Sequence, residues 1–408
     1  FSPLVQSGQD HFLIIGGGYS PSGNQVSLEK NVVFFRKLLA ESYPSSQSHD
    51  LYFADGQRPE SDIQYMVPMN DIPKANRYMA TIFGSLSKLN LRYRNSSLEN
   101  VDGMSDNKSI DQWFAESKGR IEEGDRLFIY ATAHGGKSLD KKNKYNTRLY
   151  LWGGQFIDVK KLSSHIGSLP DNVDVIIVMV QCYSGGFSHL IFQEALESNK
   201  LTNRNICGFY STVHNRVAAG CTPDINEKNY QEYSSHFWAA IRGKSRMDED
   251  IELTDFDGDG RTSFAEAHAY TLIESKTIDI PVKTSDSWLR RFSKNHSVRD
   301  SKFLPSTPYY SLIKSAEPIE LAILDGLSYE LNISGLHKYD SAKKKSDQIQ
   351  EQRKKLADES KQLSSKINRA KGATKRILQF TWPELNNIHS PESVRFLTDK
   401  SDVFVKRI

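Results

Sequence analysis

Two residues that could act as a catalytic pair, His134 and Cys182, each follow a run of apolar residues and precede small ones. His134 ends the segment DRLFIYATAH and is followed by two glycines, while Cys182 ends VIIVMVQC and is followed by YSGG. Hydrolysis by a cysteine needs a nucleophilic sulfur, a proton carrier near neutral pH and donors for the oxyanion. We expect His134 to carry the proton and to lower the pKa of the thiol. The amides of Gly135 and Cys182 are the expected oxyanion donors.

These two residues can meet only if the strands that precede them are neighbours in one sheet. Over the first 245 residues, short apolar segments alternate with helix-like ones, which predicts an α/β fold with a mainly parallel sheet flanked by helices. In such a sheet the carboxyl ends of the strands form the crevice where reactive groups gather. His214 also follows a strand and stays open as an alternative base, whereas His189 and His236 lack this placement.

The expected elements follow from the hydrophobic pattern. Strands are predicted at 11–18, 50–55, 125–133, 147–152, 173–180 and 205–211, and helices at 27–40, 109–121, 158–169 and 186–198. The last helix begins behind Cys182, where its dipole would favour a thiolate. The glycines at 16–18 suggest a dinucleotide-binding fingerprint, but Pro21 stands where the final glycine is required. We therefore expect a tight turn at the sheet edge.

Composition sets few limits on the partners. The 53 Lys and Arg residues nearly balance the 50 Asp and Glu residues, and the net charge of +3 gives no argument for nucleic-acid binding. No apolar run is long enough to span a bilayer. The chain starts with Phe, so we expect a processed product that lacks its targeting segment. The three cysteines fit neither a disulfide scaffold nor a zinc motif, and Cys207 is expected to lie in the core.

The order of these segments resembles that of a known group of enzymes. His134 precedes Cys182 by 48 residues, which is similar to the caspase-like clan of cysteine peptidases, where the interval is about 50. The closer resemblance, over residues 11–242, is to the legumain family, also called peptidase family C13. VQCYSGG is similar to its nucleophile signature, and FYSTVHNRVAAGC and YSSHFWAAI look like its substrate-lining strand and the helix that follows. The resemblance implies a caspase-like fold with His134 as general base and Cys182 as nucleophile.

The same resemblance implies a substrate pocket without naming the side chain that it accepts. By position, the expected pocket residues are Ser211, Thr212 and Gln231. The family reads asparagine with a glutamate two residues before the nucleophile, where this chain has Val180. A pocket for aspartate would need arginines, for which Arg216 and Arg148 are the candidates. The specificity is therefore left open.

A second motif, DFDGDGRTSFAE at 255–266, has the spacing of an EF-hand calcium loop. The expected ligands are Asp255, Asp257, Asp259, the Arg261 carbonyl oxygen, Ser263 and Glu266, with Gly260 at the sharp turn. The residues that follow predict an outgoing helix, whereas the preceding KSRMDEDIELT is a poor helix. We expect one structural Ca²⁺ that stabilises the neighbouring substrate edge, and an acidic surface turn is the alternative.

Three regions are expected along the chain: a catalytic domain at 1–245, the calcium loop with a connecting segment at 246–300, and a helical region at 301–408. In the helical region one apolar residue recurs every seven positions from Ala342 to Ile377. This single row predicts a long helix that packs on the body or on a partner, rather than a strong coiled coil. Such helices could cover the active site.

The sequence thus predicts a cysteine endopeptidase that acts on proteins or peptides through an acyl-enzyme intermediate on Cys182. No cofactor other than Ca²⁺, no nucleic acid and no membrane span is expected. Two alternatives stay open: transfer of the acyl group to an amine, as in a ligase or transpeptidase, and a catalytically silent, calcium-stabilised binding protein. The expected location is an extracellular or periplasmic space, where calcium is abundant.

Overall fold

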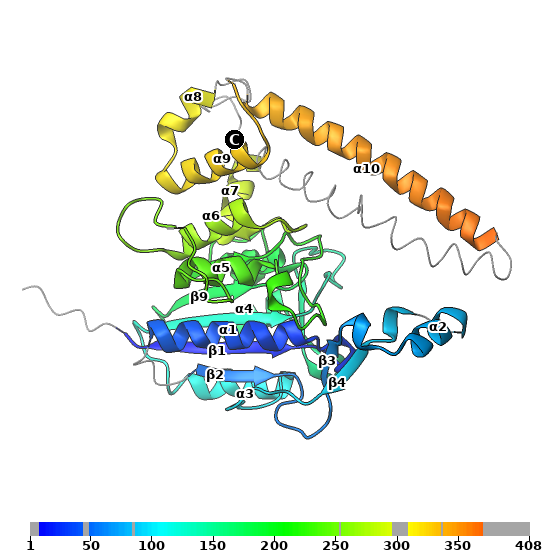
Figure 1. Ribbon diagram of the computed structural model, residues 1–408. Coiled ribbons are helices and arrows are strands. Elements are labelled where there is room, and N and C mark those ends of the chain that lie inside the picture. Colours follow the sequence, from blue (N-terminus) through cyan, green and yellow to red (C-terminus); the bar gives the residue numbers. More distant parts are fainter. Residues whose placement is uncertain are drawn as a thin grey trace, which may run out of the picture.

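A six-stranded sheet in the order β11-β10-β9-β5-β1-β2 forms the centre of the molecule (Figure 1). The computed structural model describes residues 8–43, 49–83, 86–252, 254–295, 309–335 and 338–369. The strands are β1 (Asp10–Gly17), β2 (His49–Phe53), β5 (Arg126–Ala133), β9 (Asp174–Met179), β10 (Asn205–Tyr210) and β11 (Val282–Lys283). All pairings are parallel except that of β10 with β11. The predicted α/β class with a mainly parallel sheet is confirmed.

The side chains of the central strands alternate between two apolar layers. In β5, Ile129 belongs to one core cluster and Tyr130 to the other. In β9, Ile177 and Val178 alternate in the same way. This alternation is typical of strands that are buried on both faces. It matches the register of the two strands, in which Ile129 lies beside Ile177 and Tyr130 beside Val178.

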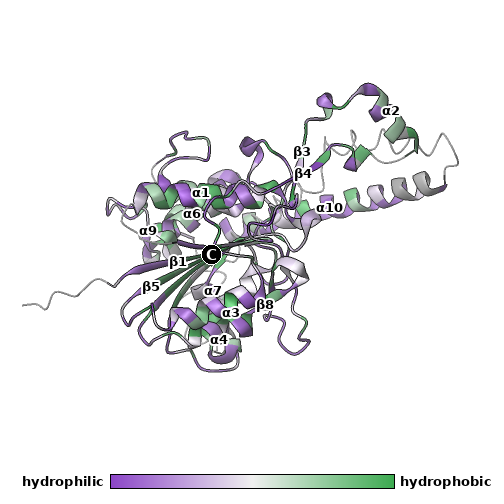
Figure 2. Cartoon of the chain, turned by 90° about the horizontal axis from the view of Figure 1, so that it is seen from below, coloured by the Kyte–Doolittle hydropathy of each residue, from purple (hydrophilic) through white to green (hydrophobic). Residues whose placement is uncertain are grey.

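Helices cover both faces of the sheet. One face is covered by α1 (Val26–Ser42), α5 (Tyr233–Arg242) and α6 (Phe264–Glu274), and the other by α3 (Asn107–Ser117) and α4 (Val159–Gly167). Figure 2 shows α1 and α6 on one side of the sheet and α3 and α4 on the other. Three of the four helices predicted from the hydrophobic pattern are confirmed, with their ends shifted by a few residues, and α5 matches the helix predicted for YSSHFWAAI.

The fourth predicted helix, at 186–198, is wrong. The chain instead forms two 3₁₀ segments, η5 (Ser184–Ile191) and η6 (Gln193–Ala195). Two neighbouring glycines at the start of η5 disfavour an α-helix. The Gly186 amide donates to the Tyr183 carbonyl at 3.1 Å, which is a tighter, three-residue turn. Phe187 and Leu190 of η5 are nevertheless buried, as their hydrophobicity predicts.

Two small antiparallel sheets lie beside the central one. The first contains β6 (Gly135–Gly136), β7 (Arg148–Tyr150) and β8 (Phe156–Asp158), so the strand expected at 147–152 does not belong to the central sheet. The second pairs β3 (Ile63–Met66) with β4 (Leu91–Arg94), and α2 (Lys74–Phe83) lies between them in the chain. Figure 1 shows α2 projecting away from the central sheet.

The outer edge of β10 is only partly covered. β11 pairs with Phe209 and Tyr210 alone. Cys207 precedes this pairing, and its side chain is exposed. The expectation that Cys207 is a core residue is therefore wrong, because β11 does not extend along β10 as far as Cys207 and the thiol is exposed.

The described residues of the predicted helical region, 309–335 and 338–369, are mainly helical. Its described helices are α8 (Tyr309–Leu312), α9 (Pro318–Glu330) and α10 (Lys338–Arg369), while α7 (Thr284–Asn295) lies before it, in the predicted connecting segment. A third apolar cluster joins α9 to α6 and includes Ala342 of α10. In the seven-residue row, Ala342 and Ile349 are buried and Leu356 is half-buried. The side chain of Leu363, and all of Ala370 and Ile377, lie outside the described residues, and the predicted cover over the active site stays a prediction.

Several short 3₁₀ segments complete the fold: η1 (Pro21–Gly23), η2 (Met69–Asp71), η3 (Leu86–Lys88), η4 (Trp152–Gly154), η7 (Glu227–Asn229) and η9 (Ile313–Ser315). The glycines at the end of β1 form the expected turn, with Gly17 in the left-handed region at φ +91°. Among the helices of the described residues, none is both long and apolar enough to cross a bilayer.

Candidate active site

β5 and β9 are neighbours in the sheet, so the loops that leave their carboxyl ends meet. His134 follows β5 directly, and Cys182 follows β9 after two residues. The loops touch at Gly135, where an added Cβ would lie 1.9 Å from the Cys182 carbonyl oxygen and 2.8 Å from Cγ of Gln181. Only a glycine fits this contact. The structure therefore brings His134, Gly135 and Cys182 together at one edge of the sheet.

Hydrogen bonds determine which nitrogen of the His134 ring carries the proton. Nε2 lies 2.8 Å from the Gly23 carbonyl oxygen and 2.9 Å from Oε1 of Gln25. The Gln25 amide is oriented by its own Nε2, which donates to the Ser22 carbonyl at 3.0 Å. Both partners of the ring are thus acceptors, so Nε2 of His134 is the donor. The neutral ring then has an unprotonated Nδ1 that can accept a proton.

The His134 ring is half-buried in this position. Burial lowers the pKa of His134 below its ordinary value, although the hydrogen bond to Gly23 acts in the opposite direction. The Tyr19 ring makes an edge contact with the imidazole at 5.2 Å between centroids. The histidine is therefore neutral at pH 7, which is the state that a general base requires.

The Cys182 sulfur lies against the segment that follows β10. Sγ accepts a hydrogen bond from the Ala218 amide at 3.3 Å. Burial raises the pKa of the Cys182 thiol, the Ala218 amide opposes this shift, and the Asp279 carboxylate adds to it. The expectation of a lowered thiol pKa is therefore wrong. The His134 ring is neutral and the helix expected behind the thiol is absent, so neither supplies the positive charge that a resting thiolate needs.

Two tertiary hydrogen bonds fix the backbone around the thiol. Tyr183 adopts the left-handed region at φ +62°, and its amide donates to the Arg216 carbonyl at 2.8 Å. The Gly185 amide donates to the Thr212 carbonyl at 2.7 Å, and a Cβ at Gly185 would lie 2.5 Å from that oxygen. A strained non-glycine residue beside a reactive group persists only where the surroundings enforce it. Here the segment 212–216 does so.

Of the predicted pocket residues, Ser211 and Thr212 lie in the interior and the others lie nearer the surface. Ser211 and Thr212 are fully buried. The Ser211 hydroxyl lies 3.2 Å from the Ser184 hydroxyl and donates to the Gln181 carbonyl at 3.3 Å. These residues still belong to the end of the sheet, because the Ser211 amide donates to the Met179 carbonyl at 3.0 Å. They support the nucleophile loop and do not line an open pocket, which corrects their predicted place.

The remaining pocket candidates lie nearer the surface. Gln231 is exposed in the turn before α5, beside Glu232. Glu232 is buried and pairs with Arg246, with 3.2 Å between Oε1 and Nη2. Arg216 is half-buried and holds Tyr183 through its carbonyl oxygen. The Arg148 guanidinium lies 5.1 Å from the centroids of both Tyr150 and Phe156, between two aromatic rings.

Two supports of the site were missed from the sequence. Gln25 and the Gly23 carbonyl lie after the carboxyl end of β1, at the same sheet edge as His134. Because the carboxyl ends of parallel strands form the crevice where reactive groups gather, their place at this edge could have been predicted. Asp279 is buried, and its Oδ1 accepts from the Ala219 amide at 2.7 Å, next to the Ala218 amide that contacts the sulfur. The sequence signal that could have indicated a buried, functional Asp279 is its place as a single acidic residue within the apolar run TIDIPV.

The acidic loop at 255–266 is folded by its own backbone. One carboxylate oxygen from each of Asp255, Asp257 and Asp259 lies within 4.8 Å of the others. Asp255 accepts from the amides of Gly258 at 2.8 Å and Gly260 at 2.8 Å. The Asp259 amide acts to lower the pKa of Asp257, but desolvation and three neighbouring carboxylates raise it above its ordinary value. A cation among these oxygens would relieve that repulsion.

The last predicted ligand, Glu266, lies under the loop. It is fully buried and forms a capping box with Ser263 at the start of α6. Its Oε1 accepts from the Phe256 amide at 2.6 Å, and its Oε2 from the Ser263 amide at 2.7 Å. Glu266 is not part of the aspartate cluster, so its carboxylate would have to exchange amide hydrogen bonds to reach an ion. α6 is the predicted outgoing helix, and the described residues between α5 and α6 form no incoming helix.

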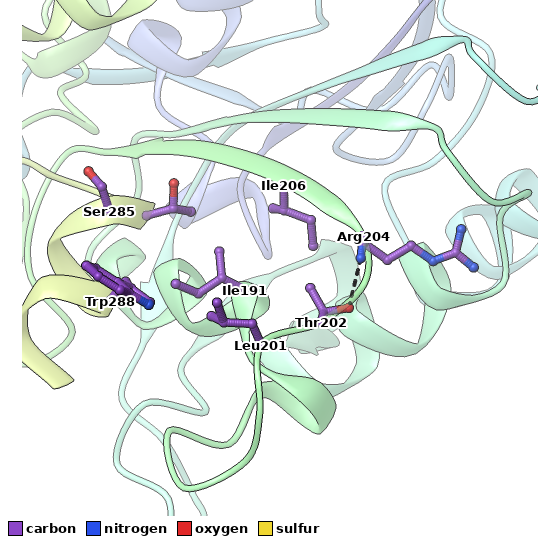
Figure 3. A pocket seen from close by; sticks show the side chains of 8 residues that line it. Ile191, Leu201, Thr202, Arg204, Ile206, Ser285 and Trp288 are labelled. Carbon is purple, nitrogen blue, oxygen red and sulfur yellow. Dashed lines mark hydrogen bonds between the residues drawn. The ribbon is translucent and has the colours of Figure 1, made fainter. Parts of the chain in front are cut away.

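A separate pocket of about 410 Å³ lies between β10, η5 and α7. Its lining residues are Ile191, Leu201, Thr202, Arg204, Ile206, Thr284, Ser285 and Trp288 (Figure 3). In Figure 3 the Arg204 guanidinium points away from the other labelled side chains, and its Nη2 donates to the Gly167 carbonyl at 3.0 Å. None of the predicted site residues lines this pocket.

No family model and no curated protein matches the chain. Among solved structures, the chain is similar to protein GSU0716 from Geobacter sulfurreducens, with 10% sequence identity and a TM-score of 0.37. The match covers 67% of this chain and 92% of that one. At this level the similarity carries no argument about function.

Proposed function

We propose that this chain is a caspase-like cysteine endopeptidase of the legumain type, with Cys182 as nucleophile and His134 as general base. The observation that carries the proposal is the orientation of His134, whose Nε2 is held by two acceptors so that Nδ1 is unprotonated. The nucleophile candidate leaves the neighbouring strand, and the two loops touch at Gly135. A neutral imidazole and a neutral thiol on two loops that touch are a pair that can exchange a proton when a substrate binds between them.

In the proposed mechanism, Nδ1 of His134 takes the proton from Cys182 as the sulfur attacks the substrate carbonyl carbon. The amides of Gly135 and Cys182 stabilise the resulting oxyanion. The imidazolium then gives its proton to the leaving amine as the peptide bond breaks, which leaves an acyl group on the sulfur. Water, activated by the neutral His134, completes hydrolysis. An amine in place of water would give a transpeptidase or ligase.

The proposal is tested by a cleavage profile of the purified chain on a peptide library, with the variants Cys182→Ala and His134→Ala measured in parallel. The proposal predicts cleavage that Cys182→Ala abolishes and His134→Ala lowers by roughly a hundredfold or more. A wild-type chain that cleaves nothing and does not react with a thiol-directed peptide probe, even after trial proteolysis of a covering segment, would favour the silent binding protein. The products distinguish hydrolysis from transfer when a free amine is added.

We further propose that the loop at 255–266 binds one structural Ca²⁺ through Asp255, Asp257 and Asp259, with the Arg261 carbonyl, Ser263 and Glu266 as the remaining predicted ligands. The loop leads into α6, and Asp279 in the segment after α6 fixes the Ala219 amide. Ca²⁺ would therefore stabilise the segment that contacts the Cys182 sulfur. A single loop without a paired partner loop among the described residues suits an extracellular or periplasmic space, where Ca²⁺ is abundant. Terbium luminescence and thermal unfolding with and without Ca²⁺ test the site.

A further inference from the structure

The α2 lobe is defined here as β3, α2, η3 and β4, residues 63–83 and 86–94. It is attached to the body at its base, where Ile63 and Ile72 are buried. The Met66 amide donates to the Pro223 carbonyl at 2.7 Å, and Arg94 pairs with the buried Glu29, with Nη1 and Oε1 3.0 Å apart. Figures 1 and 2 show that α2 itself extends away from the sheet.

α2 exposes its apolar residues to solvent. The exposed fractions are 67% for Tyr78, 56% for Met79, 45% for Ile82 and 77% for Phe83. At 100° per residue these four side chains occupy one face of the helix. A ten-residue helix gains most of its stability from packing of its apolar face, and none of the described side chains of α2 is fully buried. This face is therefore built to contact something outside the described residues.

The charge of the lobe indicates which kind of partner it fits. The lobe contains five cationic residues, Lys74, Arg77, Lys88, Arg92 and Arg94, and one acidic residue, Asp71, although the net charge of the whole chain is only +3. Lys74, Lys88 and Arg92 are exposed. An apolar helical face that contains aromatic residues and is flanked by basic ones is typical of helices that lie in the interface of an anionic membrane.

We propose that the α2 lobe binds an anionic lipid surface, with Tyr78, Met79, Ile82 and Phe83 in the interface and the lysines against the headgroups. The lobe contacts the sheet edge that carries His134. Nε2 of Gln25, the residue that orients His134, donates to Oε1 of Gln64 in β3 at 3.4 Å. A chain bound in this way would hold its candidate active site near the lipid surface. The proposal rests on the lobe alone and does not depend on the proposed peptidase activity.

Cosedimentation of the full chain with phospholipid vesicles tests this inference. We expect binding to vesicles made of equal parts phosphatidylcholine and phosphatidylserine, and roughly tenfold weaker binding to phosphatidylcholine alone. Phe83→Asp should weaken binding to both vesicles by roughly tenfold. Lys74→Glu combined with Lys88→Glu should weaken binding to the anionic vesicles only. Leu289→Asp, which introduces the same charge on α7 at a 53% exposed position, is the matched control and should bind as wild type does.

Several results would overturn the inference. They are no binding of the wild-type chain to either vesicle, equal binding of wild type and Phe83→Asp, and equal loss with Leu289→Asp. Light scattering that detects a dimer of the wild-type chain and a monomer of Phe83→Asp, without vesicle binding, would assign the face to a second copy of the chain instead. All the substituted side chains are exposed, so the variants should unfold at the same temperature as the wild type. An unchanged melting temperature then shows that a loss of vesicle binding does not come from unfolding.

Discussion

The edge that carries His134 and Cys182 and the loop at 255–266 are both short polar segments, but they are held in opposite ways. His134 is oriented by Gly23, which lies 111 residues away in the sequence. The nucleophile loop is fixed by residues of the segment after β10. The acidic loop is folded by carboxylates that accept from amides within the same twelve residues. A change at the edge should therefore act through tertiary geometry, and a change in the loop through local folding.

The largest effect that separates the two regions is expected from Gly135→Ala. The added methyl group would lie 1.9 Å from the Cys182 carbonyl oxygen, so the two loops must move apart. A displacement of this size should lower kcat/KM by roughly a hundredfold and cost about 1–3 kcal/mol of stability. Gly167→Ala has open space around its Cβ and is the control. Wild-type activity of Gly135→Ala would show that the loops do not meet as described.

The next effect concerns Gln25 and the pH dependence of activity. Because burial lowers the pKa of His134, wild-type activity should fall only as the pH drops through a value below 6.5. Gln25→Ala removes one acceptor and should lower kcat by roughly tenfold. Gln25→Glu places a carboxylate on Nε2, which favours the imidazolium and raises the pKa of His134. The acidic limb of the kcat/KM profile should then move to higher pH, a shift that a purely structural role of Gln25 would not produce.

A moderate effect is expected in the calcium loop. At saturating Ca²⁺ the wild-type chain should gain about 2–3 kcal/mol of stability when the ion is at roughly a hundred times its dissociation constant. Asp255→Ala should remove this gain and also lower the melting temperature without Ca²⁺, because Asp255 accepts from the amides of Gly258, Asp259 and Gly260. Asp171→Ala, an exposed acidic residue elsewhere, is the control. Equal thermal shifts in both variants would leave the acidic surface turn as the better description.

The smallest effect is expected from Ser211→Ala. The hydroxyl contacts Ser184 and Gln181 in the buried support of the nucleophile loop, so its loss should cost about 1 kcal/mol. The choice of cleaved peptides should not change, because Ser211 has no exposed surface. A peptide-library profile that shifts with this substitution would return Ser211 to the substrate pocket.

Local patterns allowed much of this structure to be predicted. The alternation of apolar segments gave the sheet, and the positions of His134 and Cys182 at strand ends gave their meeting point. The spacing of the acidic loop gave the aspartate cluster and the start of α6. Two features could not be predicted from the local pattern, because they depend on contacts between segments that are distant in the sequence. The pKa of Cys182 is raised by burial, lowered in part by the Ala218 amide and raised further by Asp279. The residues after Cys182 form a 3₁₀ segment because glycines and tertiary hydrogen bonds prevail over an apolar run that suggested an α-helix.

The most direct test of the central claim is to trap the acyl-enzyme. A peptide ester identified from the cleavage profile is mixed with the chain, the reaction is stopped with acid, and the modified residue is located by mass spectrometry. We predict an acyl group on Cys182 that forms quickly in the wild type, slowly in His134→Ala and not at all in Cys182→Ala. An acyl group on Cys221 or Cys207, or equal rates in the wild type and His134→Ala, would contradict it.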